Sequence, residues 1–148
     1  GQGFRPRYVG PGVTNGLNTV ATVGCAAANS VEGAQFLSPF PQLDAIDSLD
    51  PDFRRAYQQY AGSAPDDLGI ALWGLDKLVA AVLLAAGPDV TRQSFTALLE
   101  SGQGFQTGVF PPVAFGPGAH FGGSQMHLVQ ADCGSRSFRT TATFASGF

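Results

Sequence analysis

The sequence predicts an α/β protein, and three observations support this fold class. Segments with helical spacing of apolar residues and clear capping signals occupy residues 50–102. Short apolar or alternating segments bounded by Gly and Pro, which are typical of strands, lie on both sides of them. The chain of 148 residues has the length of about one domain and can bury a hydrophobic core.

The first central helix is predicted to run from Pro51 to about Tyr60. Asp50 can cap its N-terminus, and Pro51 suits the first helical position, where a missing N–H costs no hydrogen bond. Gly62 fits the end of this helix. Apolar side chains recur at spacings of three and four: Phe53, Ala56, Tyr57 and Tyr60.

The second helix is predicted to begin at Asp66 and Asp67 and to end at Ala86, before Gly87-Pro88. We expect both carboxylates to be solvated in the first turn, where the helix dipole favours negative charge. Apolar residues surround this helix almost completely, so we expect it to be buried on several sides. A membrane span is the alternative, but Asp76 and Lys77 leave fewer than the roughly 20 apolar residues that a span needs.

Two further helices follow from their caps. Thr91 is a good cap for a helix that ends near Gly102, with an inward face of Phe95, Leu98 and Leu99. Thr14 or Asn15 can cap a helix of small residues from Leu17 to about Ala28.

The strands are predicted from apolar runs and from alternation. They lie at residues 8–9, within VEGAQFLSP (31–39), and near residues 113–115, 125–131 and 137–144. The last alternates one face of Phe138, Thr140, Ala142 and Phe144 with a polar face, as a half-buried edge strand does. Residues 42–49 are predicted to form a loop.

Charge and composition exclude several classes of protein. The net charge is −3, and eight scattered Lys and Arg residues give no basic patch for nucleic acid. A hydrophobic content of 44% with 13% charged residues indicates a folded chain. The sequence has no initiating Met and no visible signal peptide, and it starts in the middle of a turn–strand unit. We therefore expect further residues upstream.

No catalytic motif accompanies the fold signals. His120 and His127 are seven residues apart, and neither belongs to a motif with metal-ligand spacing. We expect His120 in a loop and His127 in a strand, with no catalytic residue, metal or cofactor. A Cys/His hydrolase that uses Cys133 is the enzymatic alternative.

An ordered set of segments resembles the C-terminal part of type I periplasmic binding proteins, and specifically the branched-chain amino acid receptors of ABC transporters. The segments are RPRYVGPG, VEGAQFLSPFP, DFRRAYQQY, LWGLDKLVAAVLLAAG, TRQSFTALLESG and GVFPPVAFGPGAHFGG. The resemblance covers nearly the whole chain. It implies a Rossmann-like, three-layer αβα fold of two lobes, of which the N-terminal half is absent here.

The family layout implies how this chain is divided between the lobes. Residues 1–33 and 124–148 would belong to the second lobe, and residues 34–123 to the first. The first half of the family's sequence, with most core strands of both lobes, has no counterpart in the chain.

The resemblance also implies where a ligand is bound. Loops at the C-terminal ends of strands line the cleft, and the loop with Gly12, Val13, Thr14 and Asn15 is such a loop. Its hydroxyl and amide, beside the free N–H groups of a helix start, can receive a carboxylate; a turn with an N-cap is the alternative. Gly12 or Val13 stands where amino acid receptors carry an acid for the ligand ammonium, which leaves room for another small organic solute. By the family layout Trp73 would lie near the cleft, either as a ligand platform or as a core residue.

Further expectations concern the cysteines and the function. The layout puts Cys25 and Cys133 in the same lobe, where an exported protein can join them in a disulfide; two free thiols are the alternative. The resemblance implies an extracytoplasmic receptor, periplasmic or extracellular and anchored by lipid through a missing segment. It would pass a small amino acid-like ligand to an ABC permease, without catalysis. The alternative is a ligand-sensing regulatory input domain of the same fold.

Overall fold

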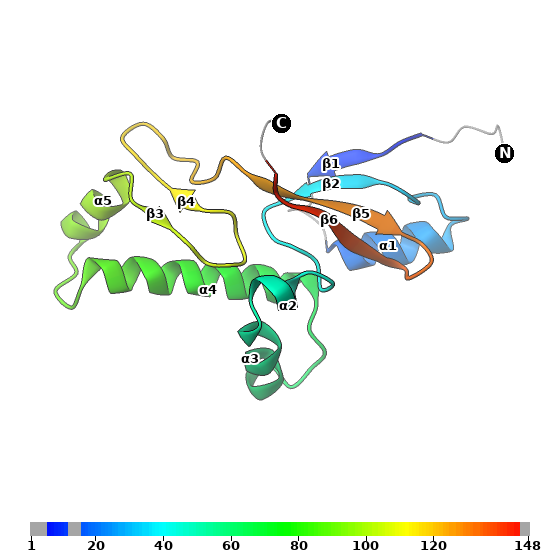
Figure 1. Cartoon of the computed structure of the whole chain (residues 1–148), viewed down its shortest axis with the longest axis horizontal. Coiled ribbons are helices and arrows are strands. Elements are labelled where there is room, and N and C mark those ends of the chain that lie inside the picture. Colours follow the sequence, from blue (N-terminus) through cyan, green and yellow to red (C-terminus); the bar gives the residue numbers. More distant parts are fainter. Residues whose placement is uncertain (1–5, 12–15, 146–148) are drawn as a thin grey trace.

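Two units make up the chain, as the computed structural model in Figure 1 shows. The structure describes residues 6–11 and 16–145. One unit is a sheet covered by a helix, and the other consists of helices with a small β-ribbon. The elements are β1 (Val9–Pro11), α1 (Leu17–Ala26), β2 (Gln35–Ser38), α2 (Ile46–Leu49), α3 (Asp52–Tyr60), α4 (Asp67–Ala86), α5 (Arg92–Glu100), β3 (Gly104–Phe105), β4 (Val113–Ala114), β5 (Met126–Asp132) and β6 (Ser137–Ala145).

The sheet unit is built from strands that are distant in the sequence. Within the described residues its order is β1-β2-β5-β6, with β1 and β2 parallel and the other pairs antiparallel. Helix α1 covers one face (Figure 1) and packs against β6. The buried core of the sheet unit consists of Leu17, Ala21, Ala34, Val129, Ala131 and Phe138. As predicted, β6 is an edge strand with Phe138 on its inner face and Arg139 exposed.

The helical unit has its own core. Helices α2 and α3 pack together, and α4 packs against α3, α5 and β3. The buried residues are Phe40, Ile46, Phe53, Ile70 and Val109. Strands β2 and β5, paired from Gln35↔Gln130 to Ser38↔His127, lead into and out of this unit.

The predicted end of α4 at Gly87 and the predicted Thr91 cap of α5 are confirmed, and Asp66 is found to cap α4. The Asp66 side chain accepts a hydrogen bond from Gly69 N at 2.7 Å, and α4 ends at Gly87, whose φ is 78°. Thr91 caps α5 through a reciprocal pair of bonds with Ser94, a capping box.

Several predicted boundaries are wrong. Residues 46–49 form the short helix α2 inside the segment predicted as a loop. Residues 31–33 form a turn, so β2 is shorter than predicted. Helix α1 ends at Ala26, because Ala28 and Asn29 have positive φ values that a helix cannot continue. The first strand is shifted to 9–11, and β3 was not predicted.

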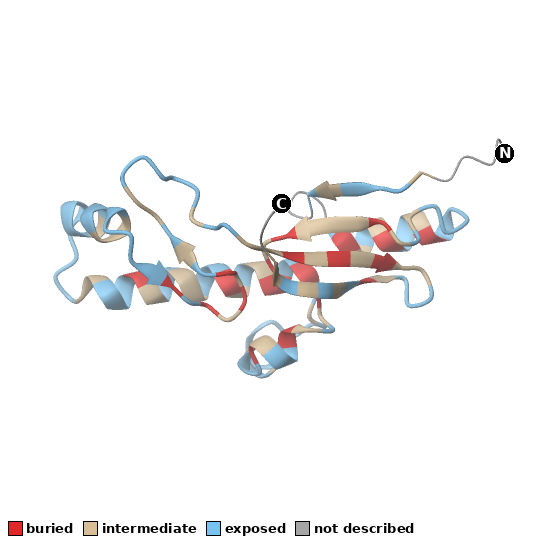
Figure 2. Ribbon diagram, turned by 45° about the horizontal axis from the view of Figure 1, so that its top comes forward, coloured by how far each residue is buried: buried red, intermediate tan, exposed pale blue. Residues whose placement is uncertain are grey.

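Helix α4 is far more exposed than predicted. By length and composition alone this helix could cross a membrane. Only 22% of its most apolar window is buried inside the protein. Figure 2 shows buried positions at intervals along it, separated by exposed ones. Its exposed apolar residues, called here the α4 stripe, are Leu68, Leu72, Leu75, Val79, Leu83 and Leu84. The expected burial fails because no sheet of the described chain covers this side of the helix.

The disulfide between Cys25 and Cys133 is formed. It joins the end of α1 to the residue that follows β5, with Cα atoms 5.1 Å apart. It therefore fastens the helix to the sheet that it covers.

Candidate functional site

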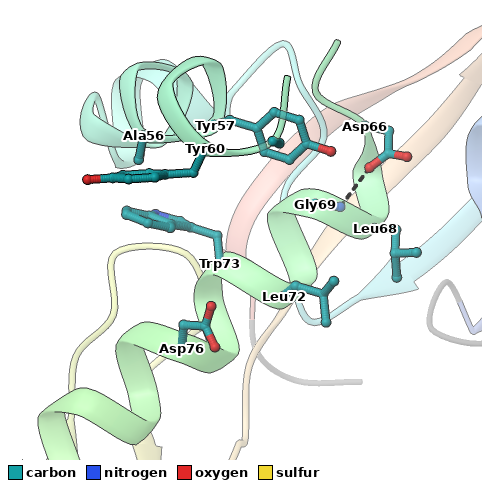
Figure 3. Close-up of a pocket in the computed structure, with 10 residues that line it drawn as sticks. Ala56, Tyr57, Tyr60, Asp66, Leu68, Gly69, Leu72, Trp73 and Asp76 are labelled. Atoms are coloured by element: carbon teal, nitrogen blue, oxygen red, sulfur yellow. Dashed lines mark hydrogen bonds between the residues drawn. The ribbon is translucent and has the colours of Figure 1, made fainter. Parts of the chain in front are cut away.

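A pocket of about 430 Å³ lies between α3 and α4 and includes Trp73 (Figure 3). Three aromatic side chains, from Tyr57, Tyr60 and Trp73, form much of its wall. Figure 3 shows the Tyr60 ring across the opening from the Trp73 indole. The lining residues are Ala56, Tyr57, Tyr60, Ala61, Asp66, Leu68, Gly69, Leu72, Trp73 and Asp76.

Trp73 is held in position by buried partners. Its Nε1 donates a hydrogen bond to Asp50 Oδ2 at 2.9 Å, and its ring centroid lies 6.3 Å from that of Phe53. Lys77 Nζ bonds the same Asp50 oxygen and lies 6.0 Å from the indole centroid. Trp73 therefore contacts the core and also lines the pocket, and its role as a ligand platform stays a prediction.

Asp50 is buried, with only 4% of its surface exposed. Burial by itself raises the pKa of this carboxyl. The hydrogen bonds from Lys77 and Trp73, together with the Lys77 charge, outweigh that effect and hold the pKa below its ordinary value. Asp50 was expected only to cap a helix, and its role in fixing Trp73 depends on a residue 23 positions away.

The pocket combines an aromatic wall with two carboxylates, from Asp66 and Asp76. Asp66 also caps α4 through Gly69 N. Such a lining suits an apolar or positively charged organic group, because aromatic faces and carboxylates both attract cations. Tyr57 and Tyr60 were predicted as part of an apolar stripe, and their spacing gave no sign that they line a pocket.

Asp67 does not lie in a solvated first turn, which corrects the sequence-based expectation. Its side chain is 5% exposed. Its Oδ2 accepts a hydrogen bond from Leu17 N at 2.6 Å, and its Oδ1 lies 3.4 Å from Asn18 Nδ2. The Asp67 carboxylate, at the start of α4, is therefore buried against the beginning of α1.

The predicted ligand loop, Gly12, Val13, Thr14 and Asn15, lies outside the described residues. The flanking residues are described: Pro11 ends β1, and Gly16 precedes α1. Trp73 is thus the predicted ligand residue that the structure describes, and its pocket belongs to the helical unit.

The histidines and cysteines do not converge on a reactive centre. His127 is fully buried in β5, as the strand prediction expected, with Nε2 3.0 Å from Val109 O, and His120 is exposed in a loop. Cys133 is in the disulfide, so it offers no thiol for a Cys/His hydrolase. Among the described residues no group of three or more His, Cys, Asp or Glu could hold a metal ion.

Comparison with known families identifies the family to which the chain belongs. The family model described as periplasmic binding protein matches residues 2–137. The chain belongs to the periplasmic binding protein family. Members of this family are binding proteins that take small-molecule ligands outside the cytoplasm.

A solved structure has the same fold. It is that of a possible leucine/isoleucine/valine-binding protein from Rhodopirellula baltica SH 1, with a TM-score of 0.62 and 22% identity. The match covers 94% of this chain and 36% of that one, so the chain spans about a third of that structure. No curated protein matches the chain.

Proposed function

We propose that the chain is the C-terminal part of a solute-binding receptor of an ABC importer, which holds a small amino acid-like or related organic ligand between two lobes. The family match over residues 2–137 carries this proposal. The solved structure with the same fold is described as a possible leucine/isoleucine/valine-binding protein, which favours that ligand class. No chemical step is part of the proposal, and the ligand would be passed unchanged to a permease.

The two-lobe assignment is part of the proposal. Residues 1–33 and 124–148 would belong to the second lobe, and residues 34–123 to the first. The separate cores of the sheet unit and the helical unit support this division. Closure would then bend the chain where β2 and β5 pass between the units, as in hinged binding proteins.

We also propose that an N-terminal part of the same protein completes both lobes. The α4 stripe supports this, because a helix with so much exposed apolar surface normally packs against another element. The partial coverage of the solved structure supports it as well. Export and a lipid anchor would then depend on that upstream part.

The proposed ligand contacts are Gly12, Val13, Thr14 and Asn15, with Trp73 as an aromatic contribution from the other unit. The loop follows β1 and precedes α1, which is the position that open α/β sheets use for ligands. A carboxylate there would meet free N–H groups at the start of a helix.

A thermal-shift titration tests the proposal on both the longer natural protein and the 148-residue chain. Leucine, isoleucine, valine, other small amino acids and organic acids form the panel. Ligand at 100 times its Kd should stabilise the longer protein by about 2.7 kcal/mol. Replacing Thr14 and Asn15 together by Ala should weaken binding at least tenfold, whereas Glu100→Gln in α5 should leave it unchanged. If no compound shifts the longer protein, the receptor proposal fails.

A further inference from the structure

The pocket between α3 and α4 has three aromatic faces, and two of them are fixed by the core. The ring centroid of the buried Phe53 lies 5.4 Å from that of Tyr57 and 6.3 Å from that of Trp73. The Asp50 carboxylate accepts a hydrogen bond from the Trp73 indole at 2.9 Å, which fixes the ring further. Both walls therefore keep their positions without a ligand, as in a preorganised binding site.

Tyr60 supplies the third aromatic face, and its side chain is 79% exposed. Figure 3 shows its ring across the opening from the Trp73 indole, so a guest in the opening meets an aromatic face on each side. Gly69 makes room for the remaining wall, because a Cβ added there would overlap Cε2 of the Tyr57 ring. The aromatic faces of the pocket thus depend on residues from both helices.

The described lining of the pocket carries negative charge and contains no Lys, Arg or His. Its two carboxylates, from Asp66 and Asp76, are exposed and lie at opposite ends of the opening in Figure 3. Within the described residues neither of them forms an ion pair. Lys77 lies 6.0 Å from the Trp73 centroid, but the buried Asp50 already balances its charge. Carboxylates and aromatic faces therefore both favour a positively charged guest.

The remaining walls favour a cation that carries methyl groups. Besides the rings and carboxylates, the lining includes the apolar side chains of Ala56, Ala61, Leu68 and Leu72. Asp66 Oδ1 already accepts from Gly69 N at 2.7 Å, so few acceptors remain for the N–H groups of a primary ammonium. A quaternary ammonium has no N–H group to satisfy and contacts aromatic faces through its methyl groups. The volume of about 430 Å³ accommodates such a head with a short organic body.

We infer that this pocket binds a small organic cation of the quaternary ammonium class. Tyr57, Tyr60 and Trp73 surround the methyl groups, and Asp66 and Asp76 balance the charge. Trp73 is also a proposed contact for a ligand between the lobes, but the pocket is formed by α3, α4 and the residues that join them. The inference therefore rests neither on the proposed receptor function nor on the loop of residues 12–15.

Titration of the 148-residue chain with choline tests the inference, with the fluorescence of Trp73, the single Trp, as the signal. The matched ligand is 3,3-dimethylbutan-1-ol, a neutral isostere in which carbon replaces the charged nitrogen. The ionic strength is kept constant with NaCl. Choline should bind about tenfold more tightly than the isostere. Equal affinities, or no binding of choline, would overturn the inference.

Variants at exposed positions then locate the bound cation. Tyr60→Leu should weaken choline binding about fivefold, whereas Tyr60→Phe keeps the aromatic face and should weaken it less. Asp76→Asn should weaken it about threefold, because one carboxylate charge is lost. The matched controls Phe121→Leu and Asp89→Asn remove an exposed ring and an exposed carboxylate outside the pocket and should leave the affinity unchanged. Unchanged affinity in both Tyr60→Leu and Asp76→Asn would overturn the site.

Calorimetric titration of the longer natural protein completes the test. Choline should bind it with an affinity within about threefold of that of the 148-residue chain, since the same aromatic faces and carboxylates form the site. Loss of binding in the longer protein would overturn the site, because another part of that protein would then fill the pocket. The receptor proposal is tested with amino acids and organic acids and with the Thr14 and Asn15 replacements, so its failure is seen separately.

Discussion

The Asp50 carboxylate accepts a hydrogen bond from the Trp73 indole at 2.9 Å and another, on the same oxygen, from Lys77. Asp50 precedes α3, whereas the other two residues project from α4. This pair of bonds therefore fixes the angle at which α4 meets the α2–α3 segment. It also sets the position of the aromatic wall of the pocket.

Asp50→Ala should destabilise the chain by about 2–3 kcal/mol. The change leaves the Trp73 N–H without its acceptor and Lys77 without its buried partner, although Lys77 can turn partly to solvent. Urea denaturation followed by tryptophan fluorescence measures the loss, since Trp73 is the single Trp. Asp52→Ala is the control: it breaks the exposed pair with Arg55, which should cost less than about 1 kcal/mol. Equal losses in the two variants would contradict the role of Asp50.

Gly74→Ala should destabilise α4, although Ala is the better helix former. A Cβ at this position would lie 2.9 Å from Val109 Cγ1 and 3.0 Å from the Phe110 ring. Overpacking of this kind costs about 1–3 kcal/mol, more than the roughly 1 kcal/mol that Ala gains in a helix. Gly104→Ala is the matched control, since no atom lies within 4 Å of its added Cβ. Chemical denaturation of both variants gives the comparison, and a stabilised Gly74→Ala would refute the packing argument.

The Thr91 cap of α5 and the end of α4 at Gly87 could be predicted from sequence because such signals are local. Asp66 and Gly69, and Thr91 and Ser94, are three residues apart, so the bond that begins each helix lies within one short segment. Alternation in β6 is equally local. These signals were sufficient to predict the α/β class and the longer helices.

The candidate site could not be predicted in the same way. The environment of Asp67 is set by Leu17, 50 residues away, and that of Trp73 by Asp50. Helix α2 has four residues and no side-chain cap, so its apolar pattern is too short to recognise. The exposure of α4 depends on which other elements cover it, which its own periodicity does not reveal.

Removal of the disulfide should cost about 4–5 kcal/mol, because Cys25 and Cys133 close a loop with a sequence separation of 108. The double Cys→Ser variant and the parent chain under dithiothreitol should show the same lowered urea midpoint. Loss of the bond should also increase hydrogen exchange in α1, which the disulfide fastens beside the sheet. Coincident transitions for the oxidised and reduced parent would contradict this prediction.

Acid should destabilise the fold through His127. Burial lowers the pKa of this ring below its ordinary value of 6.5, and the hydrogen bond with the Val109 carbonyl opposes the shift only in part. The unfolded chain therefore binds the proton at higher pH than the folded chain does. The contribution of the neutral ring to stability is complete above about pH 6.5 and is lost as the pH falls from there toward the folded pKa, by at most about 1.4 kcal/mol per pH unit. Denaturation midpoints between pH 5 and 8 measure this slope. In His127→Gln, whose amide can still donate to Val109 O, this dependence of stability on pH should become flatter. The control His120→Gln, at an exposed site, should keep the dependence of the parent chain. If the pH dependence of the parent survives in His127→Gln, other groups cause the acid sensitivity.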